Sequence, residues 1–211
     1  RLGRFTLIER IGQGGMGVVF SAYDPELDRK VAIKLVRLDH WASGDTRGRD
    51  SALAEARAMA RVSHPNVVAV YEVGATGDGL YVAMEFVRGS TLRHWAAHER
   101  SWTEVAEVFA QICRGLEAVH ATGLIHRDIK PDNLMVRDDG RAQVLDFGIA
   151  RSLGELDSNG MPISAANAGD THDRGIIGTP AYLAPELFAG FPADARSDQW
   201  ALCIAMFEVL Y

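Results

Sequence analysis

Apolar and polar residues alternate along the first part of the chain, and this spacing predicts strands. Short segments rich in β-branched and aromatic residues lie at 5–11, 18–23, 31–36, 67–73 and 80–86. The first three follow one another through tight turns, which predicts an antiparallel meander. Residues 39–49 are polar and are expected to be irregular, whereas helix formers at 52–62 predict one helix before the turn signal at 63–66.

After residue 88 the apolar residues recur at every third or fourth position, which predicts helices. We expect a short helix at 91–99, a long helix from a cap at Ser101 or Thr103 to about His120, and a final helix at 199–211. Two short strands are expected at 134–136 and 143–145. A strand-rich half before a helix-rich half predicts an α+β fold of two lobes, residues 1–87 and 88–211, with a ligand cleft between them.

Charge and cysteine content narrow the function classes. Twenty-two basic residues against 28 acidic residues give a net charge of −6, which argues against a nucleic-acid partner. The two cysteines, Cys113 and Cys203, lie in apolar helical runs, and we expect buried, reduced thiols in a cytoplasmic protein. No run of about 18 apolar residues is present, so no membrane contact is expected within these residues.

Three glycines at 12, 14 and 17 form a G-x-G-x-x-G pattern. Glycine lets the backbone approach phosphate oxygens closely, because it has no Cβ atom. A dinucleotide-binding turn would need a helix directly after the glycines, but a β-rich segment follows here. The pattern therefore favours a hairpin that covers phosphates, while a dinucleotide-dependent enzyme and a merely flexible hairpin tip remain as alternatives.

Lys34 ends the segment Val31-Ala32-Ile33-Lys34 and shares a strand face with Ala32. A lysine on a strand face is usually only solvated. Glu55 lies on the predicted helix, and a buried ammonium needs a carboxylate partner to offset its desolvation cost. We therefore expect Lys34 and Glu55 to form a pair.

A third group of polar residues follows the long predicted helix. Asp128, Lys130 and Asn133 lie in the segment His126-Arg127-Asp128-Ile129-Lys130-Pro131-Asp132-Asn133, and Asp146-Phe147-Gly148 follows shortly after. Phosphoryl transfer needs hard oxygen ligands for magnesium and a group that accepts the proton of the attacking hydroxyl. Asn133 and Asp146 are the metal candidates, Asp128 is the candidate base, and Lys130 can neutralise the moving phosphoryl group.

Taken together, and with Ala184-Pro185-Glu186 near the end, these motifs resemble the eukaryotic-type (Hanks-type) serine/threonine protein kinase catalytic domain. The Gly-Gly-Met-Gly form of the glycine loop resembles bacterial members. The resemblance implies a bilobal fold, with an antiparallel sheet and one main helix in the N-lobe and a mainly helical C-lobe. It also implies ATP and Mg²⁺ as cofactors, with Mn²⁺ as an alternative metal.

The resemblance assigns a role to each matching residue. The catalytic set is Asp128, Lys130, Lys34 and Glu55, and the metal ligands are Asn133 and Asp146. Asp198 corresponds to the helix residue that anchors the catalytic loop. The ATP-binding set consists of Ile11, Gly12, Gln13, Gly14, Gly15, Met16, Gly17, Val19, Ala32, Lys34, Met84, Glu85, Val87 and Met135.

Several features indicate which kind of kinase is expected. Lys130 and the segment Gly178-Thr179-Pro180-Ala181-Tyr182 match serine/threonine kinases, so the expected partners are ATP and proteins with serine or threonine acceptors. Arg127 beside Asp128 suggests control by activation-loop phosphorylation. Thr171 is the expected main autophosphorylation site, with Ser164 or Ser158 secondary, and a kinase homodimer is one route to it.

Both ends of the sequence look cut, so we expect an incomplete C-lobe within a longer protein whose kinase domain is cytoplasmic; a membrane anchor elsewhere in the parent protein remains an open alternative. We also expect Glu186 to be unpaired and an apolar face of the last helix to be exposed. A nucleotide-binding pseudokinase is the runner-up, but Lys34, Asp128 and Asp146 are all present. Small-molecule phosphotransferases fit less well, because they usually carry glycine where Arg127 stands.

Overall fold

The computed structural model describes residues 1–14, 17–37, 46–76, 79–145 and 180–211. The chain folds into two compact units. The first unit comprises Arg1–Ser63 and Val68–Val87, and the second comprises His64–Val67 and Arg88–Tyr211. Among the described residues, no helix has both the length and the apolar character needed to cross a membrane.

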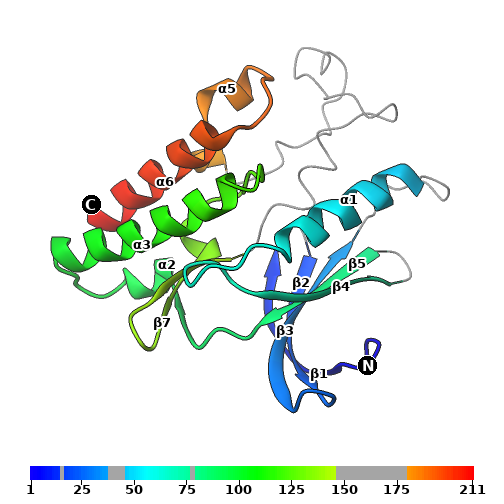
Figure 1. Cartoon of the computed structure of the whole chain (residues 1–211). Helices are drawn as coiled ribbons and strands as arrows, with labels where there is room; N and C mark the ends of the chain where they lie inside the picture. Colours follow the sequence, from blue (N-terminus) through cyan, green and yellow to red (C-terminus); the bar gives the residue numbers. More distant parts are fainter. Residues whose placement is uncertain (15–16, 38–45, 77–78, 146–179) are drawn as a thin grey trace. The chain divides into compact units, whose positions relative to one another are not determined.

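A five-stranded antiparallel sheet forms most of the first unit (Figure 1). Its strands lie in the order β1-β2-β3-β5-β4, so the fourth strand in sequence pairs at the edge beside the fifth. The bounds are β1 Thr6–Gly14, β2 Gly17–Asp24, β3 Arg29–Arg37, β4 Val70–Thr76 and β5 Gly79–Glu85. The predicted antiparallel meander is confirmed. The strand expected at 67–73 begins later, because Val67 pairs with Val144 in the second unit.

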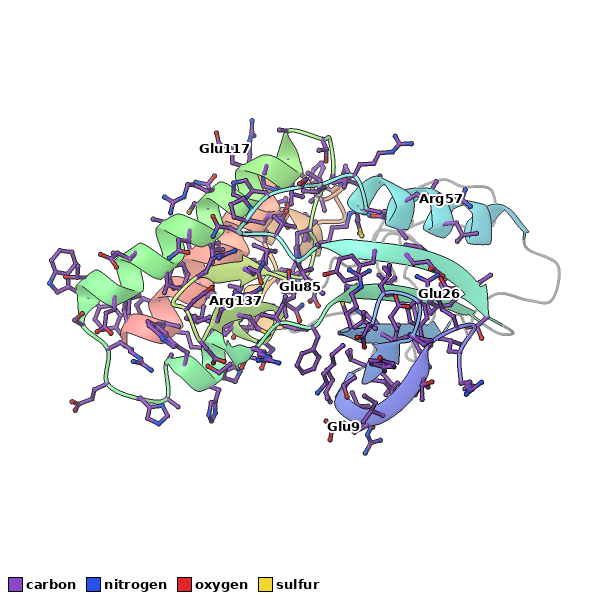
Figure 2. All side chains as sticks on the ribbon, turned by 60° about the horizontal axis from the view of Figure 1, so that its bottom comes forward. Glu9, Glu26, Arg57, Glu85, Glu117 and Arg137 are labelled. Atoms are coloured by element: carbon purple, nitrogen blue, oxygen red, sulfur yellow. The ribbon has the colours of Figure 1, made fainter. Side chains whose placement is uncertain are left out.

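The single long helix described in the first unit, α1, spans Thr46–Met59. It begins earlier than predicted, because the polar residues before position 52 contain no proline and can continue a helix. It ends earlier as well: Val62 N–H donates to the Met59 carbonyl at 3.0 Å, which closes a turn instead of extending the helix. Ala56 and Met59 are buried, whereas Arg57 projects into solvent (Figure 2).

An arginine joins distant parts of the sheet in the first unit. Arg4 Nε donates to Asp24 Oδ1 at 3.1 Å, and Arg4 Nη1 lies 2.6 Å from Glu72 Oε2. The Tyr81 hydroxyl donates to the other oxygen of Glu72 at 2.6 Å. Because Asp24 ends β2 and Glu72 lies on the edge strand β4, this Arg4 cluster ties together strands that do not pair with each other. Next to it, Phe5 packs in the core of the unit.

The second unit is mainly helical. Its two long helices, α3 Trp102–His120 and α6 Ala195–Leu210, lie side by side (Figure 1). The shorter elements are β6 Gly89–Thr91, α2 Leu92–Trp95, the 3₁₀ turn η1 Pro131–Asn133, β7 Leu134–Arg137, β8 Ala142–Val144, the 3₁₀ turn η3 Pro180–Tyr182 and α5 Pro185–Phe188. The α+β class is confirmed, although the helix expected at 91–99 is only one turn long.

Helix α3 begins where the sequence places its cap. Ser101 Oγ accepts from the Glu104 N–H at 3.2 Å, and the Glu104 carboxylate accepts from the Ser101 N–H at 2.9 Å, which is a capping box. Ile112 and Leu116 are buried against α6 in one core cluster, whereas Glu117 projects into solvent (Figure 2). The apolar periodicity of this segment thus marks its packed face.

The turn at His64–Val67 is bonded to the second unit. Asn66 Nδ2 donates to the Ala142 carbonyl at 2.8 Å, and the Val144 N–H donates to the Asn66 carbonyl at 2.9 Å. Gly115 on α3 makes this approach feasible, because a Cβ atom there would lie 2.5 Å from the Asn66 carbonyl oxygen. This segment is therefore fixed by the second unit although its neighbours in sequence belong to the first.

One expectation about side chains is wrong. Cys113 and Cys203 are exposed rather than buried, because both lie beside the packed stripes of α3 and α6 instead of within them. Glu186 was expected to lack an arginine partner, and the structure gives its carboxylate a neutral donor, Ser197 Oγ, at 2.7 Å. The expected exposed apolar face of α6 is present and includes Trp200, Phe207, Leu210 and Tyr211.

Candidate active site

The loop that contains the candidate base is fixed by a carboxylate of α6. Asp198 accepts hydrogen bonds from the backbone N–H groups of His126 and Arg127, both at 2.8 Å. Arg127 has φ 66°, a left-handed conformation that is unfavourable for a residue with a Cβ atom. The two bonds to Asp198 hold this strained backbone in place, as the resemblance implied for that residue.

Asp198 is charged in the folded protein although it is 1% exposed. Burial alone would raise its pKa, but the hydrogen bond from His120, at 2.8 Å, and the two backbone N–H groups lower the pKa below its usual value. A carboxylate that accepts several hydrogen bonds is stabilised in its ionised form. The sequence analysis did not identify His120. Its only signal was its position as the last residue of the long apolar helix.

His126 links the loop to the strand that precedes Asp146. Its ring is fully buried, with Nε2 2.6 Å from the Leu145 carbonyl oxygen. Nδ1 accepts from the Asp128 N–H at 3.3 Å. Only a neutral ring with its proton on Nε2 satisfies both contacts. The backbone of Asp128 is thus positioned by a buried side chain as well as by the loop.

The carboxylate of Asp128 is held by two neighbours. Lys130 Nζ donates to Asp128 Oδ2 at 2.9 Å, and Asn133 Nδ2 donates to the same oxygen at 2.7 Å. Asn133 Nδ2 also donates to the Asp128 backbone carbonyl at 2.7 Å. Asp128 is 6% exposed, and these donors help to compensate for the loss of water around its carboxylate. The three residues form a compact group in which one carboxylate has a fixed orientation and an adjacent cation.

Asn133 fits the role of a metal ligand. Its nitrogen faces Asp128, which leaves the amide oxygen as the atom that can face a cation, and magnesium prefers oxygen ligands. Asp146, the other candidate ligand, lies outside the described residues, as do Phe147, Gly148 and the proposed phosphorylation sites. The part of the chain that the structure describes contains no group of three or more His, Cys, Asp or Glu suited to a metal ion.

The candidate nucleotide-binding residues of the first unit lie on paired strands. Val19 on β2 is opposite both Gly12 on β1 and Lys34 on β3. Ala32 on β3 is opposite Met84 on β5. The register therefore brings together residues that are far apart in sequence, while Gly15 and Met16 lie outside the described residues.

Lys34 is only 7% exposed, and its candidate partner Glu55 is half-buried on α1. Their pairing stays a prediction. The remaining candidates in this unit, Ile11, Gln13, Gly14, Glu85 and Val87, lie at or beside the ends of β1 and β5. Met135 belongs to the second unit, on β7.

Gly17 has a structural requirement besides its expected role near phosphate. It has φ 145°, and a Cβ atom there would lie 2.0 Å from the Leu35 carbonyl oxygen. Any other residue would therefore have to separate β2 from β3. The sequence analysis assigned this glycine only to phosphate binding, because strand packing is not visible in a local motif.

A depression opens beside Asp128 in the second unit. Its lining includes Arg127, Asp128, Tyr182, Leu187 and Ser197. Tyr182 ends the segment that the sequence analysis matched to serine/threonine kinases. The depression thus places Tyr182 near the candidate base Asp128.

Comparison with known proteins identifies the family to which these features correspond. Residues 5–211 match the family described as the protein kinase domain. The apo form of PpkA-294 has a similar structure, with a TM-score of 0.74 and 26% sequence identity, covering 99% of this chain and 76% of that chain.

Several bacterial proteins are similar in sequence. The chain is 38% identical to the probable serine/threonine-protein kinase PknB of Corynebacterium glutamicum, over 98% of this chain and 31% of that protein. It is 36% identical to the serine/threonine-protein kinase Pkn1 of Myxococcus xanthus, over 100% and 29%, and 34% identical to PrkC of Bacillus subtilis, over 99% and 30%. The chain thus spans less than a third of the length of these relatives.

Proposed function

Since the chain belongs to the protein kinase family, we propose that it transfers the γ-phosphate of ATP to serine and threonine hydroxyls of proteins. The observation that carries this proposal is the group formed by Asp128, Lys130 and Asn133. It combines an oriented carboxylate, an adjacent cation and an amide oxygen suited to a metal. Phosphoryl transfer requires these three functions at its reacting centre.

Asp128 accepts the proton of the attacking hydroxyl in the proposed reaction. The hydroxyl oxygen forms a bond to the γ-phosphorus while the bond from that phosphorus to the bridging oxygen of ADP breaks. Lys130 supplies positive charge beside the transferred group, since it already lies 2.9 Å from the Asp128 carboxylate. A bound Mg²⁺ would neutralise phosphate charge, with Asn133 and Asp146 as its ligands, and Mn²⁺ is the alternative metal.

Nucleotide binding is assigned to the first unit. The backbone of Gly12 to Gly17 would cover the phosphates, Lys34 would bind the α- and β-phosphates with Glu55 as its partner, and the adenine would contact Val19, Ala32 and Met84. Glu85 and Val87 would bind the adenine edge through their backbone. The strand register supports this assignment, because it brings these residues together on β1, β2, β3 and β5.

Regulation by phosphorylation is the second part of the proposal. Thr171 would be the main autophosphorylation site, with Ser164 and Ser158 secondary, and a kinase homodimer would allow transfer between two copies. The parent protein would be membrane-anchored, with this domain in the cytoplasm. Phosphopeptide mapping after incubation with ATP tests the first point: phosphate found only outside residues 152–179 would exclude Thr171.

A kinase assay with purified full-length protein tests the proposed activity. Transfer from radiolabelled ATP to a serine and threonine peptide mixture should fall by roughly 10²–10⁴ in Asp128→Asn, the usual contribution of a general base. Asp139→Asn is the matched control, because Asp139 is an exposed aspartate in the β7–β8 turn. Unchanged transfer in Asp128→Asn would remove Asp128 from its role. Nucleotide binding without transfer in the parent would favour a pseudokinase.

A further inference from the structure

Two histidines lie together on the surface of the second unit, at α2 and the turn that follows it. His94 belongs to α2, His98 lies four positions later, and both are exposed. Their rings are in contact, with centroids 6.0 Å apart and ring planes at 78°. Residues four positions apart lie on the same face of a helical turn, so both rings point to one side of this segment. We name His94 and His98 the histidine pair.

The histidine pair differs from the other histidines that the structure describes. The rings of His64, His120 and His126 are each hydrogen-bonded to backbone or carboxylate groups within the fold. In the described part of the chain, the rings of His94 and His98 contact each other but form no hydrogen bond or ion pair with a protein group. A neutral imidazole has one nitrogen lone pair, so each ring of the pair can offer one to a ligand from solution.

The backbone around the histidine pair is fixed. The His94 N–H donates to Thr91 Oγ1 at 3.3 Å, and the Ala97 N–H donates to the His94 carbonyl at 3.2 Å. Arg100 Nε donates to the Trp95 carbonyl at 3.1 Å, and the Arg100 guanidinium lies 4.5 Å from the centre of the Trp95 ring. Only the two imidazole rotamers therefore have to adjust when a ligand binds, which keeps the entropic cost of binding low.

The separation of the two rings fits a shared metal ion. Zinc–nitrogen bonds of about 2.1 Å place two imidazole centroids of one tetrahedral site about 5 Å apart. The observed separation of 6.0 Å is close to this value, and exposed side chains can rotate to close the difference. Two histidines four residues apart on one helical face are a known arrangement of zinc ligands. Imidazole suits zinc, copper and nickel, whereas magnesium prefers oxygen ligands.

The charges near the histidine pair do not oppose a cation. Arg93 pairs with Asp132 at 2.9 Å and with Glu208 at 2.5 Å, and Arg100 lies 3.9 Å from Glu104. Both neighbouring guanidinium groups are thus compensated by carboxylates. A divalent ion at the pair would therefore meet no uncompensated arginine from this group.

We propose that the histidine pair is a binding site for a divalent transition metal ion, Zn²⁺, with water in the remaining coordination positions. The site is distinct from the candidate magnesium ligands Asn133 and Asp146, because its donors are nitrogen atoms. Its occupation does not depend on the proposed phosphoryl transfer. A bound zinc ion links α2 to the turn after it and stabilises the folded chain, because the unfolded chain does not hold the two rings together.

Calorimetric titration of the full-length protein with Zn²⁺ tests this inference. Excess Mg²⁺ is present throughout, so that sites built from oxygen ligands are occupied. The parent should bind one zinc ion more tightly than either His94→Gln or His98→Gln does. Each substitution should weaken that Kd roughly 100-fold, because a chelate of two linked ligands becomes a single contact. Binding at this site should also be lost at about pH 5, because zinc requires deprotonated imidazole.

His40→Gln is the matched control, because it removes a histidine from another part of the chain. It should keep the zinc affinity of the parent. Thermal unfolding separates loss of zinc from loss of fold: without zinc all three variants should have the Tm of the parent, and zinc should raise Tm only in the parent and in His40→Gln. Unchanged zinc affinity in both His94→Gln and His98→Gln would overturn the inference, and so would equal weakening in His40→Gln. Neither measurement involves phosphoryl transfer, so the proposed kinase activity is tested separately.

Discussion

Two arginines of this chain have nearly the same partners in different surroundings. Arg4 in the first unit pairs with Asp24, Glu72 and Glu26, and Arg93 in the second pairs with Asp132 and Glu208. In each case a tyrosine hydroxyl donates to one of the carboxylates, Tyr81 to Glu72 and Tyr182 to Glu208. The side chain of Asp24, the partner of Arg4, is 0% exposed, whereas that of Asp132, the partner of Arg93, is 47% exposed. Both clusters share their chemistry, so burial and location decide what each one does.

The Arg4 cluster is structural by this comparison. When Arg4 is removed, Asp24 loses its main cation and keeps only the more distant Arg29, at 3.8 Å, and the Glu26 N–H. Loss of the main partner of a buried carboxylate is destabilising. The Arg93 cluster is open to water and borders the candidate base, so its loss changes the charge of the surface more than it changes stability. An ion pair near a catalytic residue therefore does not necessarily stabilise the fold.

Substitution of Asp198 should have the largest effect, because this residue is both buried and bound to the segment that contains the candidate base. It is buried like Asp24 but binds the loop that carries Asp128, so Asp198→Ala should lower both stability and phosphoryl transfer. We expect a fall of about 100-fold in kcat, because a small displacement of a reacting group has a cost of this order. Steady-state kinetics and thermal unfolding of the same preparation would check both effects. If Asp198→Ala had lower stability but normal kcat, the hydrogen bonds of Asp198 would not be needed to position Asp128.

The same substitution in the two clusters tests the comparison directly. Arg4→Ala should lower Tm by roughly 5 °C, because Asp24 remains buried with its main cation lost. Arg93→Ala should lower Tm by no more than about 2 °C, because water can solvate Asp132 and Glu208. Differential scanning fluorimetry of both variants beside the parent gives the measurement. Equal shifts in Tm would contradict the distinction between a buried, stabilising cluster and an exposed cluster that contributes little to stability.

Acid pH should produce a smaller effect, confined to the buried cluster. Burial alone would raise the pKa of Asp24, but the hydrogen bonds from Arg4 and from the Glu26 N–H lower it below its usual value. A carboxylate with a lowered folded-state pKa stabilises the protein above its unfolded pKa of about 3.9, and this contribution disappears as pH falls through the folded-state value. The Tm difference between Arg4→Ala and the parent should therefore persist from pH 7 to about pH 5 and shrink below about pH 4. A difference that disappears already near neutral pH would exclude Asp24 as its source.

Local patterns predicted the strands, the long helices and the catalytic segment from sequence. The periodicity of 3.6 residues marked α3, and Ser101 with Glu104 marked its start. The loop motif brought Asp128, Lys130 and Asn133 together because all three lie within six residues. Features of this kind depend on neighbours in the chain, and a sequence displays such neighbours directly.

Long-range contacts could not be predicted in this way. The contact of Arg93 with Glu208 spans 115 positions, and that of His120 with Asp198 spans 78. The exposure of Cys113 and Cys203 depends on which flank of each helix the neighbouring helix covers, and an apolar run does not specify that. The pairing of Glu186 with Ser197 likewise depends on how α5 meets α6.

The central claim is that Asp128 supports phosphoryl transfer by this chain. Intact mass of the full-length protein after incubation with Mg-ATP, beside its Asp128→Asn variant, tests that claim most directly. We predict that the parent gains the mass of one or more phosphates and that the variant gains none. A parent that binds nucleotide but gains no phosphate, or a variant that gains as much as the parent, would contradict it.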